Sequence, residues 1–416
     1  MFPETHGVMM AKNKTDSFNS RRPLFSICLP SRNRFETVTK SIQSVIDQDF
    51  KSYELLVSDN STIGKGQLGK WVEGQGKKAD LVQVFETPSD LDMDQNWEFI
   101  GNKARGEYVL FLADRWLMRR GTLSVLSRII EESNPDLFYW PGQKFGLLED
   151  RLSGATSALP VECEIENAHD VLEKFLQFNG YENRNVYGQP IPRALNSGFR
   201  RQIGEQAKGI WGHLFRPISP DYTSATALLL LSDKCVHIKE MMYVPTGKKS
   251  NFSDSTIIGL RAYLEKFPDC NSWRNLAMDT VFLTVLTDVE HTLDGWHDGE
   301  IWKSKFNIEN ALKCIMWEFH FKEFNGSLHD TKAMREQVYA FARANGLEPD
   351  AIERIREYDR FNRHKFVGVR KLLRRLGLYE RARDLNNRIR YRSRTQRKQG
   401  LHTELDGANR PIEFGS

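Results

Sequence analysis

Polar side chains that could bind a nucleotide follow two apolar stretches near the start of the chain. The first stretch runs into the sequence PSRNR and the second into SDNS. Arginine guanidinium groups offer fixed forks of N–H donors to phosphate oxygens, and an aspartate accepts hydrogen bonds from a base or a ribose. The alternative is that both are surface loops with ordinary capping residues. The residues that we expect to bind a nucleotide here are Pro30, Arg32, Asn33, Arg34, Asp59 and Asn60.

A third polar set ends the apolar run of the sequence GEYVLFLADR, where Asp114 lies between Ala113 and Arg115. Asp114 can anchor a divalent cation, because Mg²⁺ is often held by one or two protein carboxylates together with phosphates and water. Arg115 can instead neutralise a diphosphate directly, since two unit charges about 4 Å apart interact by about 4 kcal/mol at an effective dielectric constant of about 20. A third interpretation is that Asp114 and Arg115 only pair with each other at the end of a strand.

The elements that must position these residues follow from the hydrophobic pattern between residues 23 and 140. Short apolar runs alternate there with stretches of helical period, which is typical of βα units around a mainly parallel sheet. Ligands of such open sheets bind at the carboxyl ends of the strands, so we expect the three polar sets to share one edge. The sequence predicts strands over 24–30, 53–59, 81–86, 108–114 and 136–140, and helices over 35–46, 94–104 and 122–132.

After residue 140 the pattern first weakens and then becomes mainly helical. Loop signals dominate up to about residue 187, and the sequence PIPRALNSG predicts a turn, followed by a basic helix. Further elements expected are a helix over 168–178, an apolar helix over 223–231, a strand over 235–244, mostly helix from 251 to about 394, and a disordered tail over 399–416.

The composition excludes several classes of protein. At 416 residues the chain is long enough for two domains, and its hydrophobic content of 40% is ordinary for a globular protein. No apolar run approaches the roughly 18 residues of a bilayer span, and residues 1–22 lack the apolar region of a signal peptide. Five cysteines lie scattered without CxxC spacing, which argues against a disulfide framework or a zinc site. We therefore expect a cytoplasmic protein with a flexible leader over 1–22 and reduced core thiols.

The net charge of +4 hides a strongly basic segment near the end of the chain. Residues 360–400 contain fifteen Lys or Arg and only two acidic residues, so the rest of the chain is mildly acidic. Val, Leu and Tyr recur there at helical spacing among the arginines, a pattern typical of a helix on an anionic membrane surface or on nucleic acid. No recognised nucleic-acid-binding fold accompanies the charge, so nucleic acid is the less favoured partner. A solvated terminal helix is the remaining alternative.

A family resemblance joins these observations. The strings FSICLPSRNR and YELLVSDNST resemble the N-terminal half of family 2 glycosyltransferases, the inverting enzymes of the GT-A fold. GEYVLFL, with Gly121 and Leu123 beginning the next helix, looks like the family's strand that leads into its acidic D-x-D motif. NPDLFYW and PRALNSGFRR are similar to bacterial members, so the resemblance covers about residues 23–255. It implies an α/β fold with a GT-A-like, mainly parallel sheet flanked by helices, followed by a largely helical C-terminal region.

The sequence departs from the family at the D-x-D motif, where it reads Ala113, Asp114 and Arg115. In the family, one carboxylate supports the sugar or ribose, and the other binds a divalent ion that bridges the two phosphates of the donor. The resemblance thus implies a divalent cation, Mg or Mn, with Asp114 as the motif's one remaining ligand. All three residues are expected to face the donor.

The resemblance also suggests a general base, which an inverting transfer needs to remove the proton from the acceptor hydroxyl. In the family this carboxylate lies well after D-x-D, on a loop that leads into a helix, and Asp221 in SPDYTSA fits that place. The alternative role of Asp221 is helix capping. His213 is a secondary candidate for the base, although a His near Trp211 and Phe215 is more often a packed loop residue.

A last candidate set lies in the sequence LDMDQNWEF, which the resemblance places near the donor. Asn96 and Trp97 could line the sugar or the acceptor there. The alternative is that Trp97 belongs to the core and that Asp94 caps the helix.

Taken as a whole, the resemblance implies a hexosyl-type glycosyltransferase. It would move a sugar from a nucleotide-diphosphate donor to a saccharide or lipid-linked saccharide acceptor, in the assembly of a bacterial surface polysaccharide such as O-antigen or capsule. The enzyme would be cytoplasmic or peripheral on the inner face of the membrane, attached through 360–398. The alternative is a non-catalytic subunit that binds a nucleotide-sugar or a glycan. We expect a GT-A domain over 23–255, with a nucleotide-sugar half over 23–140 and an acceptor half over 141–255, and a helical region over 256–398.

Overall fold

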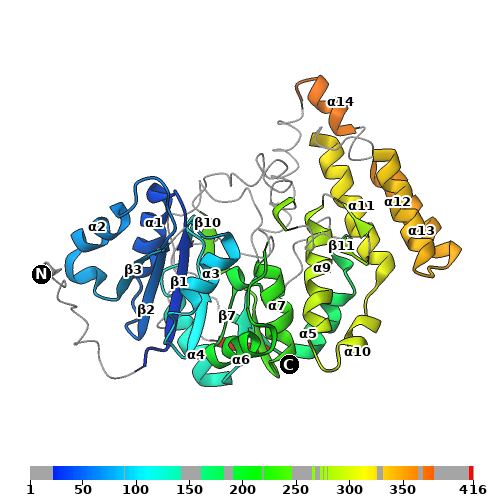
Figure 1. Cartoon of the computed structure of the whole chain (residues 1–416). Coiled ribbons are helices and arrows are strands. Elements are labelled where there is room, and N and C mark those ends of the chain that lie inside the picture. The colour runs from blue at the N-terminus through cyan, green and yellow to red at the C-terminus, as the bar shows by residue number, and fades with distance from the viewer. Residues whose placement is uncertain are drawn as a thin grey trace, which may run out of the picture.

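A sheet of nine strands runs through the centre of the computed structural model, and helices cover both of its faces (Figure 1). The strand order is β13-β7-β9-β6-β8-β4-β1-β2-β3, and most neighbouring strands are parallel. A largely helical region follows, so the predicted fold class is confirmed. The structure describes residues 22–88, 90–141, 161–181, 191–217, 220–245, 265–267, 272–274, 276–278, 280–325, 331–363, 369–378 and 412–415.

The first four strands along the chain are parallel, and three of them are buried on both faces, as a strand covered by helices on each side requires. β1 (Phe25–Ser31) lies between β2 (Tyr53–Asp59) and β4 (Tyr108–Phe111), and β3 (Val82–Glu86) forms the edge beyond β2. Every residue of β1 and β2 is buried. β1, β2 and β3 agree with the predicted strands to within one residue.

The second half of the sheet contains the strands that the sequence predicted least well. β6 (Leu137–Tyr139) was expected, whereas β8 (Ser197–Arg200) was expected to be part of a turn. β8 lies antiparallel between β4 and β6, and a Cβ added at Gly198 would come within 2.5 Å of the Phe138 ring. The glycine that suggested a turn is therefore needed for close packing between strands.

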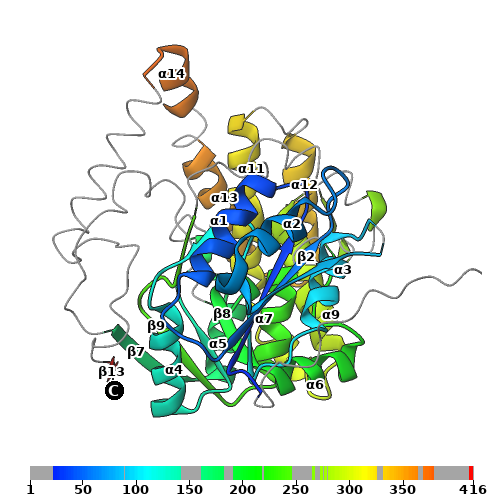
Figure 2. The same ribbon diagram turned by 90° about the vertical axis from the view of Figure 1, so that its left-hand side faces the viewer.

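Two further strands complete this half of the sheet beyond β9 (Lys234–Ile238). β7 (Val161–Asn167) was not predicted, although Val, Cys and Ile alternate with Glu along it. β13 (Ile412–Gly415) pairs with β7 in parallel, so the expectation of disorder over 399–416 is wrong for these residues (Figure 2). The side chains of Ile412 and Phe414 pack against a buried apolar cluster, which gives this short strand a reason to form.

The predicted strands over 108–114 and 235–244 proved too long. In each case the strand of the central sheet ends early, and the chain then forms a separate short strand outside that sheet. After β4 the chain turns at Ala113, whose carbonyl accepts a hydrogen bond from the Trp116 backbone N–H at 3.0 Å. β5 (Trp116–Met118) then pairs with β10 (Tyr243–Pro245) in a small antiparallel ribbon. The turn between β4 and β5 is where the third polar set lies.

One face of the sheet is covered by α1 (Phe35–Ile46), α2 (Gln67–Gly74) and α4 (Thr122–Ser133) (Figure 2). α1 has the predicted bounds, whereas α2 was not predicted. The apolar side chains of these helices and of β1, β2 and β4 form one buried cluster. The loops before α1 and α2 are therefore held firmly above the carboxyl ends of β1 and β2.

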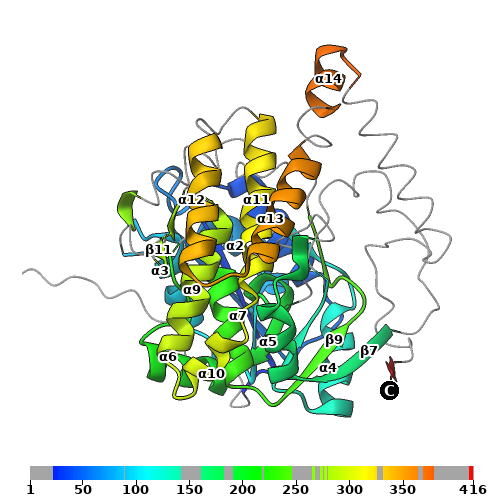
Figure 3. The same cartoon turned by 90° about the vertical axis from the view of Figure 1, so that its right-hand side faces the viewer.

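The other face is covered by α3 (Met93–Gly101), α5 (Ala168–Leu176), α6 (Arg201–Trp211) and α7 (Pro220–Leu230). The C-terminal helices pack outside this layer (Figure 3). A single cluster of buried apolar side chains extends from Cys28 in the sheet to Ile355 in these helices. The C-terminal helices are α9 (Val281–Asp294), α10 (Gly299–Ser304), α11 (Ile308–Asn325), α12 (Thr331–Ala344) and α13 (Pro349–Asn362), with α14 (Val369–Arg375) beyond them.

Other expectations concern thiols, domain limits and membranes. Cys28, Cys163, Cys235 and Cys314 are free and buried, as predicted, and Cys270 lies outside the described residues. The leader over 1–21 and the boundary near 255 also lie outside them, so the predicted domain limits remain predictions. Within the described ranges, no helix combines the length and the apolar character needed to cross a bilayer.

Candidate functional site

The register of the parallel strands brings the three polar sets to one edge of the sheet. Ser31 at the end of β1 pairs with Asp59 at the end of β2. On the other side of β1, Cys28 pairs with Phe111, so Asp114, three residues further on, falls beside Ser31. The Ser31 hydroxyl donates a hydrogen bond to Asp114 Oδ2 at 3.3 Å. Asp114, Ser31 and Asp59 thus form a row along the carboxyl ends of the strands, which is the predicted arrangement.

Asp114 is paired with Arg34 rather than with its neighbour Arg115. Arg34 Nη1 lies 2.8 Å from Asp114 Oδ1, and the Asp114 side chain is only 8% exposed. The interpretation in which Asp114 and Arg115 merely pair with each other is therefore wrong for these residues. Both carboxylate oxygens of Asp114 accept a hydrogen bond, one from Arg34 and one from Ser31.

Arg115 is half-buried beside this pair. No hydrogen bond or ion pair joins its guanidinium group to any residue within the described ranges. Burial and the nearby charge of Arg34 lower the pKa of Arg115, while the carboxylate of Asp114 acts in the opposite direction. An arginine remains charged despite such a shift, so the site holds a cation with five unused N–H donors.

A cavity of about 250 Å³ opens next to the row of polar residues. Its walls come from the β1–α1 loop and the β2–α2 loop, so it lies between the two polar sets that were first expected to bind a nucleotide. Asp59 and Arg34 supply its charged groups. The lining residues are Ser31, Asn33, Arg34, Phe35, Val38, Asp59, Ser61, Ile63, Gly64, Gln67 and Leu68.

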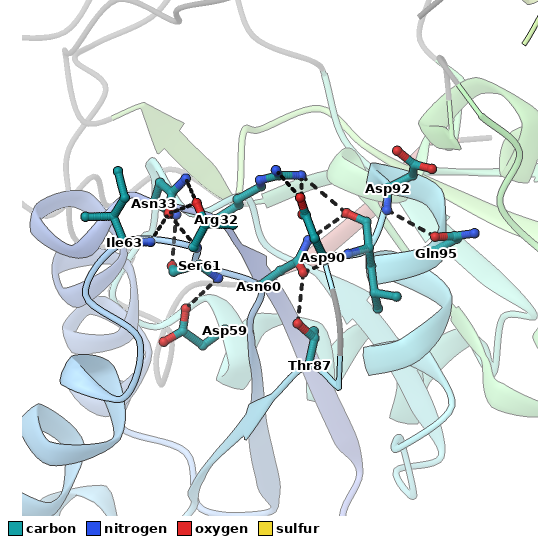
Figure 4. Close-up of polar contacts among 12 residues, drawn as sticks. Arg32, Asn33, Asp59, Asn60, Ser61, Ile63, Thr87, Asp90, Asp92 and Gln95 are labelled. Carbon is teal, nitrogen blue, oxygen red and sulfur yellow. Dashed lines mark hydrogen bonds and ion pairs between the residues drawn. The ribbon is translucent and has the colours of Figure 1, made fainter. Parts of the chain in front are cut away.

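Asn33 ties the two walls of this cavity together (Figure 4). Its Oδ1 accepts hydrogen bonds from the backbone N–H groups of Thr62 at 2.9 Å and Ile63 at 3.1 Å, and its own N–H donates to Ser61 Oγ at 2.9 Å. Asn33 has a φ of 54°, a left-handed conformation that Asn tolerates better than most residues. Its polar groups are thus used to fix the shape of the cavity.

Arg32 and Asn60 have a similar structural role in the loop that follows β3 (Figure 4). Arg32 pairs with Asp90 at 2.8 Å. The Asn60 side chain donates to the Leu91 carbonyl at 2.7 Å and accepts from the Leu91 N–H at 3.0 Å and from the Thr87 hydroxyl at 2.8 Å. Both residues therefore hold this loop in place at the edge of the cavity.

The helix that follows this loop, α3, begins differently from the prediction. Asp92 is its N-cap and forms a capping box with Gln95, so the suggestion that Asp94 caps the helix is wrong. Asn96 is buried and accepts a hydrogen bond from Ser58 Oγ at 2.7 Å. Trp97 is 7% exposed and packs in the core. The structure does not bring Asn96 or Trp97 into the lining of the cavity.

The candidate base Asp221 lies in the first turn of α7, where Arg193 Nη1 is 3.8 Å from its Oδ2. Its side chain is 23% exposed. Burial raises the pKa of Asp221, while Arg193 and the backbone N–H groups of Asp221 and Tyr222 act to lower it. Asp221 is the second residue of α7 and so is not its N-cap, although its carboxylate accepts hydrogen bonds from backbone N–H groups of this first turn.

Arg193 places Asp221 on the same edge of the sheet as Asp114. It directly precedes η3 (Ala194–Asn196), which leads into β8. Because β8 is antiparallel to β4, it begins where β4 ends, and Leu110 pairs with Gly198. Arg193 was missed in the sequence, since its partner comes from a distant loop and no local spacing indicates the pair.

His213 lies away from this edge, on the loop between α6 and α7. Its pKa is lowered by burial and by Arg216, and Glu98 in α3 acts in the opposite direction. Arg216 in turn pairs with Asp288 in α9 at 3.0 Å. The structure thus groups His213 with α3 and α9, and gives it no contact with Asp114, Asp59 or Asp221 among the described contacts.

The fold and the row of polar residues agree with a family assignment. Residues 26–150 match the family model described as "Glycosyl transferase family 2". Over these residues the chain is similar to a family 2 glycosyltransferase domain, so the resemblance seen in the sequence is confirmed there. The matched residues include Asp59, Asp114 and Arg115, but not Asp221.

A curated relative is the GalNAc(5)-diNAcBac-PP-undecaprenol beta-1,3-glucosyltransferase of Campylobacter jejuni subsp. jejuni serotype O:2. It is 30% identical over 165 residues, which are 37% of this chain and 49% of the relative. The chain thus spans about half the length of the curated relative that it matches.

Solved structures with some likeness include S. aureus TarS and the mannosyltransferase PcManGT from Pyrobaculum calidifontis. TarS has 14% identity and a TM-score of 0.45, covering 82% of this chain and 54% of TarS. PcManGT, in complex with GDP-Man and Mn²⁺, has 13% identity and a TM-score of 0.39, covering 83% of this chain and 88% of PcManGT. TM-scores this low give the ligands of these structures no bearing on this chain.

Proposed function

We propose that the protein is an inverting glycosyltransferase that moves a sugar from a nucleotide-diphosphate donor to a saccharide or lipid-linked saccharide acceptor. The observation that carries the proposal is the row of Asp114, Ser31 and Asp59 beside a cavity, within a family 2 glycosyltransferase domain. In an open α/β sheet this edge is where ligands bind. The name of the curated relative, a glucosyltransferase whose acceptor contains PP-undecaprenol, supports an acceptor of this kind in bacterial surface polysaccharide assembly.

In the proposed complex, the nucleoside occupies the cavity and its base or ribose donates hydrogen bonds to Asp59. One oxygen of Asp59 already accepts from the Ser61 N–H at 3.1 Å, which fixes the orientation of the carboxylate. The diphosphate then extends along the strand ends towards Arg34 and Arg115. The acceptor approaches from the side of Asp221.

Asp221 acts as the general base in this mechanism. It takes the proton of the acceptor hydroxyl while the hydroxyl oxygen forms a bond to the anomeric carbon. The bond from that carbon to the diphosphate oxygen breaks on the opposite face, and its electron pair leaves with the nucleoside diphosphate. A raised pKa makes Asp221 a stronger base than an exposed aspartate. A single displacement of this kind inverts the configuration at the anomeric carbon.

The test is a transfer assay over a panel of nucleotide-sugars, with release of nucleoside diphosphate as the readout. An enzyme releases the diphosphate with at least one donor, and Asp221→Asn abolishes release while binding of the diphosphate survives. Release that is unaffected by Asp221→Asn would contradict the mechanism.

A second candidate function is a non-catalytic subunit that binds a nucleotide-sugar or glycan. The observation that favours it is the replacement of the outer D-x-D positions by Ala113 and Arg115. This function predicts binding of a nucleotide-sugar without turnover over the whole donor panel. The same assay therefore separates the two candidates.

We further propose that the basic segment 360–398 attaches the protein to the inner face of the membrane. Leu372 in α14 and Leu376 directly after the helix are 57% and 59% exposed, beside Arg374 and Arg375. Exposed leucines next to arginines suit the boundary of an anionic bilayer. We expect binding to vesicles that contain phosphatidylglycerol but not to pure phosphatidylcholine, and a Leu372→Ser, Leu376→Ser variant should bind more weakly. Equal binding to both kinds of vesicle would contradict this attachment.

A further inference from the structure

The carboxylate of Asp114 is poorly suited to bind a divalent cation. Its Oδ1 accepts from Arg34 at 2.8 Å and its Oδ2 from Ser31 at 3.3 Å, so a metal ion bound to Oδ1 would lie beside a guanidinium cation. Mg²⁺ and Mn²⁺ take oxygen ligands, and the motif supplies no second acid. The residues present therefore do not fit the divalent ion that the family implies.

The charges around Asp114 also disfavour the binding of a divalent cation. Two carboxylates that hold Mg²⁺ give a net charge of zero, whereas Arg34, Arg115 and Asp114 together give +1 without any ion. Adding a divalent ion would bring three like charges into one half-buried site, and such repulsion is strong where water is scarce. A diphosphate placed against the two guanidinium groups therefore meets a net positive charge without any divalent ion.

Arg115 has the freedom that such a role requires. Its guanidinium group is half-buried without a hydrogen bond or ion pair to any residue in the described part of the chain. A buried cation is normally paired, because the loss of hydration must be offset. Arg34 is different, since Asp114 binds its Nη1, and Arg34 also lines the cavity.

We propose that Arg34 and Arg115 bind the donor's diphosphate in place of a divalent cation, and that Asp114 serves to hold Arg34. The inference rests on the proposed function, because it concerns the same donor site. When the bond between the anomeric carbon and the diphosphate oxygen breaks, the electron pair stays on the diphosphate. The two guanidinium forks then stabilise the charge that develops on its oxygens. Asp114 is thus a positioning residue.

The experiment measures the affinity of purified full-length protein for UDP, GDP, CDP and ADP by calorimetry, in EDTA and then in excess Mg²⁺ or Mn²⁺. We expect the best of these ligands to bind equally well, within about twofold, in EDTA and in metal. Binding that EDTA abolishes would overturn the inference but leave the proposed function standing. If none of the four binds under any condition, the proposed function fails and the inference fails with it.

Variants of Arg115 give the second arm of the test. In EDTA, Arg115→Gln should weaken binding of the nucleoside diphosphate by about tenfold to a hundredfold, the usual effect of losing a hydrogen bond to a charged group. The affinity for the corresponding nucleoside should not change, because the nucleoside lacks the phosphates. Arg115→Lys keeps the charge but lacks the forked N–H donors. Its affinity for the nucleoside diphosphate should lie between those of wild type and Arg115→Gln. The matched control is Arg120→Gln, an exposed arginine two residues after β5, for which we expect no change.

Asp114→Asn separates the two possible roles of this carboxylate. If Asp114 positions Arg34, the variant should bind the diphosphate more weakly in EDTA as well as in metal. If Asp114 were a metal ligand, the loss would appear only in the presence of metal, and this result would overturn the inference. Circular dichroism and thermal unfolding of each variant check that the fold is retained, and an Arg115→Gln variant that is folded and binds like Arg120→Gln would also overturn it.

Discussion

Two arginine–aspartate pairs lie at the same edge of the sheet, one on each side of the site. Arg34 is in direct contact with Asp114 at 2.8 Å, and Ser31 satisfies the second oxygen of the carboxylate. Arg193 is 3.8 Å from Asp221, too far for a normal hydrogen bond, and the pKa of Asp221 is raised by burial despite that arginine. The distance between the partners thus decides what each carboxylate can do. Asp114 is fixed as an anchor, whereas Asp221 keeps an oxygen that can accept a proton.

The largest effect that would test this comparison is expected for Asp221→Asn. The amide has the size of the carboxylate but cannot accept a proton at neutral pH, and general base catalysis typically contributes a factor of 10² to 10⁴. We expect the turnover number of the transfer reaction to fall about a thousandfold. The affinity for the nucleoside diphosphate should stay within about twofold of wild type. A loss of rate below about tenfold would mean that another group is the base.

A third carboxylate extends the comparison to a residue without access to water. Asp288 in α9 is fully buried, and its Oδ2 has no hydrogen-bond partner among the described residues. Burial raises the pKa of Asp288 to about 7, although Arg216 acts to lower it. In the unfolded chain this carboxyl ionises near its ordinary pKa of about 3.9. The unfolded state therefore gains stability from ionisation before the folded state does, and folding stability is lost as the pH rises from about 4 to about 7.

Replacing Asp288 by Asn should remove this part of the pH dependence. The free energy of unfolding of wild type, relative to Asp288→Asn, should fall by up to about 4 kcal/mol between pH 4 and 7 and stay level above. Urea unfolding at a series of pH values measures the difference. Asp294→Asn, on an exposed position of the same helix, is the control, and a difference that does not vary with pH would contradict the assignment.

Arg193→Gln sharpens the comparison between the two pairs directly. Arg193 acts to lower the pKa of Asp221, so its removal should raise that pKa further. A general base works only when it is deprotonated, so the acidic limb of the profile of kcat/KM against pH should move to higher pH. Arg128→Gln, on the far side of the sheet in α4, should leave the profile unchanged. If the acidic limb does not move, Arg193 does not influence the pKa of the general base.

The smallest effect is expected for Asp92→Ala, a carboxylate of the same edge with a purely structural role. The variant loses the N-cap and the capping box of α3, which should cost about 1 kcal/mol of folding free energy. The affinity for nucleoside diphosphates should be unchanged, because Asp92 is not among the residues that line the cavity. Denaturant unfolding and calorimetry on the same sample measure both quantities.

The sequence predicted the strands that carry the site and missed the contacts between them. Fully apolar runs such as β1 and β2 stand out, and the polar residue that ends each run marks the functional edge. The strand β7 was missed because loop signals dominate the sequence up to about residue 187, although the alternation of Val161, Cys163 and Ile165 with glutamates was a usable signal. The register between β1 and β4 places Asp114 beside Ser31. This neighbourhood can be derived from the ends of the two strands only once their pairing is known.

The parts that could not be predicted are those that depend on distant segments. Arg34 and Asp114 are 80 residues apart, and nothing local distinguishes Arg34 from Arg32, which binds Asp90 instead. Arg193 precedes β8, whereas Asp221 lies in the first turn of α7, after both β8 and α6. Asn33 and Asn60 looked like ligand-binding residues because they are polar and follow a strand, but their side chains are occupied by neighbouring loops.

The network of hydrogen bonds around Asn33 affects both the association rate and the affinity of a ligand. Fixing the backbone of one residue costs about 1 to 2 kcal/mol, and residues 61–63 are already fixed by Asn33 before any nucleoside arrives. This wall of the cavity is therefore already ordered when the ligand binds, and binding does not have to pay the entropy cost of ordering it. Breaking these bonds with Asn33→Gly, which keeps the left-handed backbone, should show itself mainly as slower association.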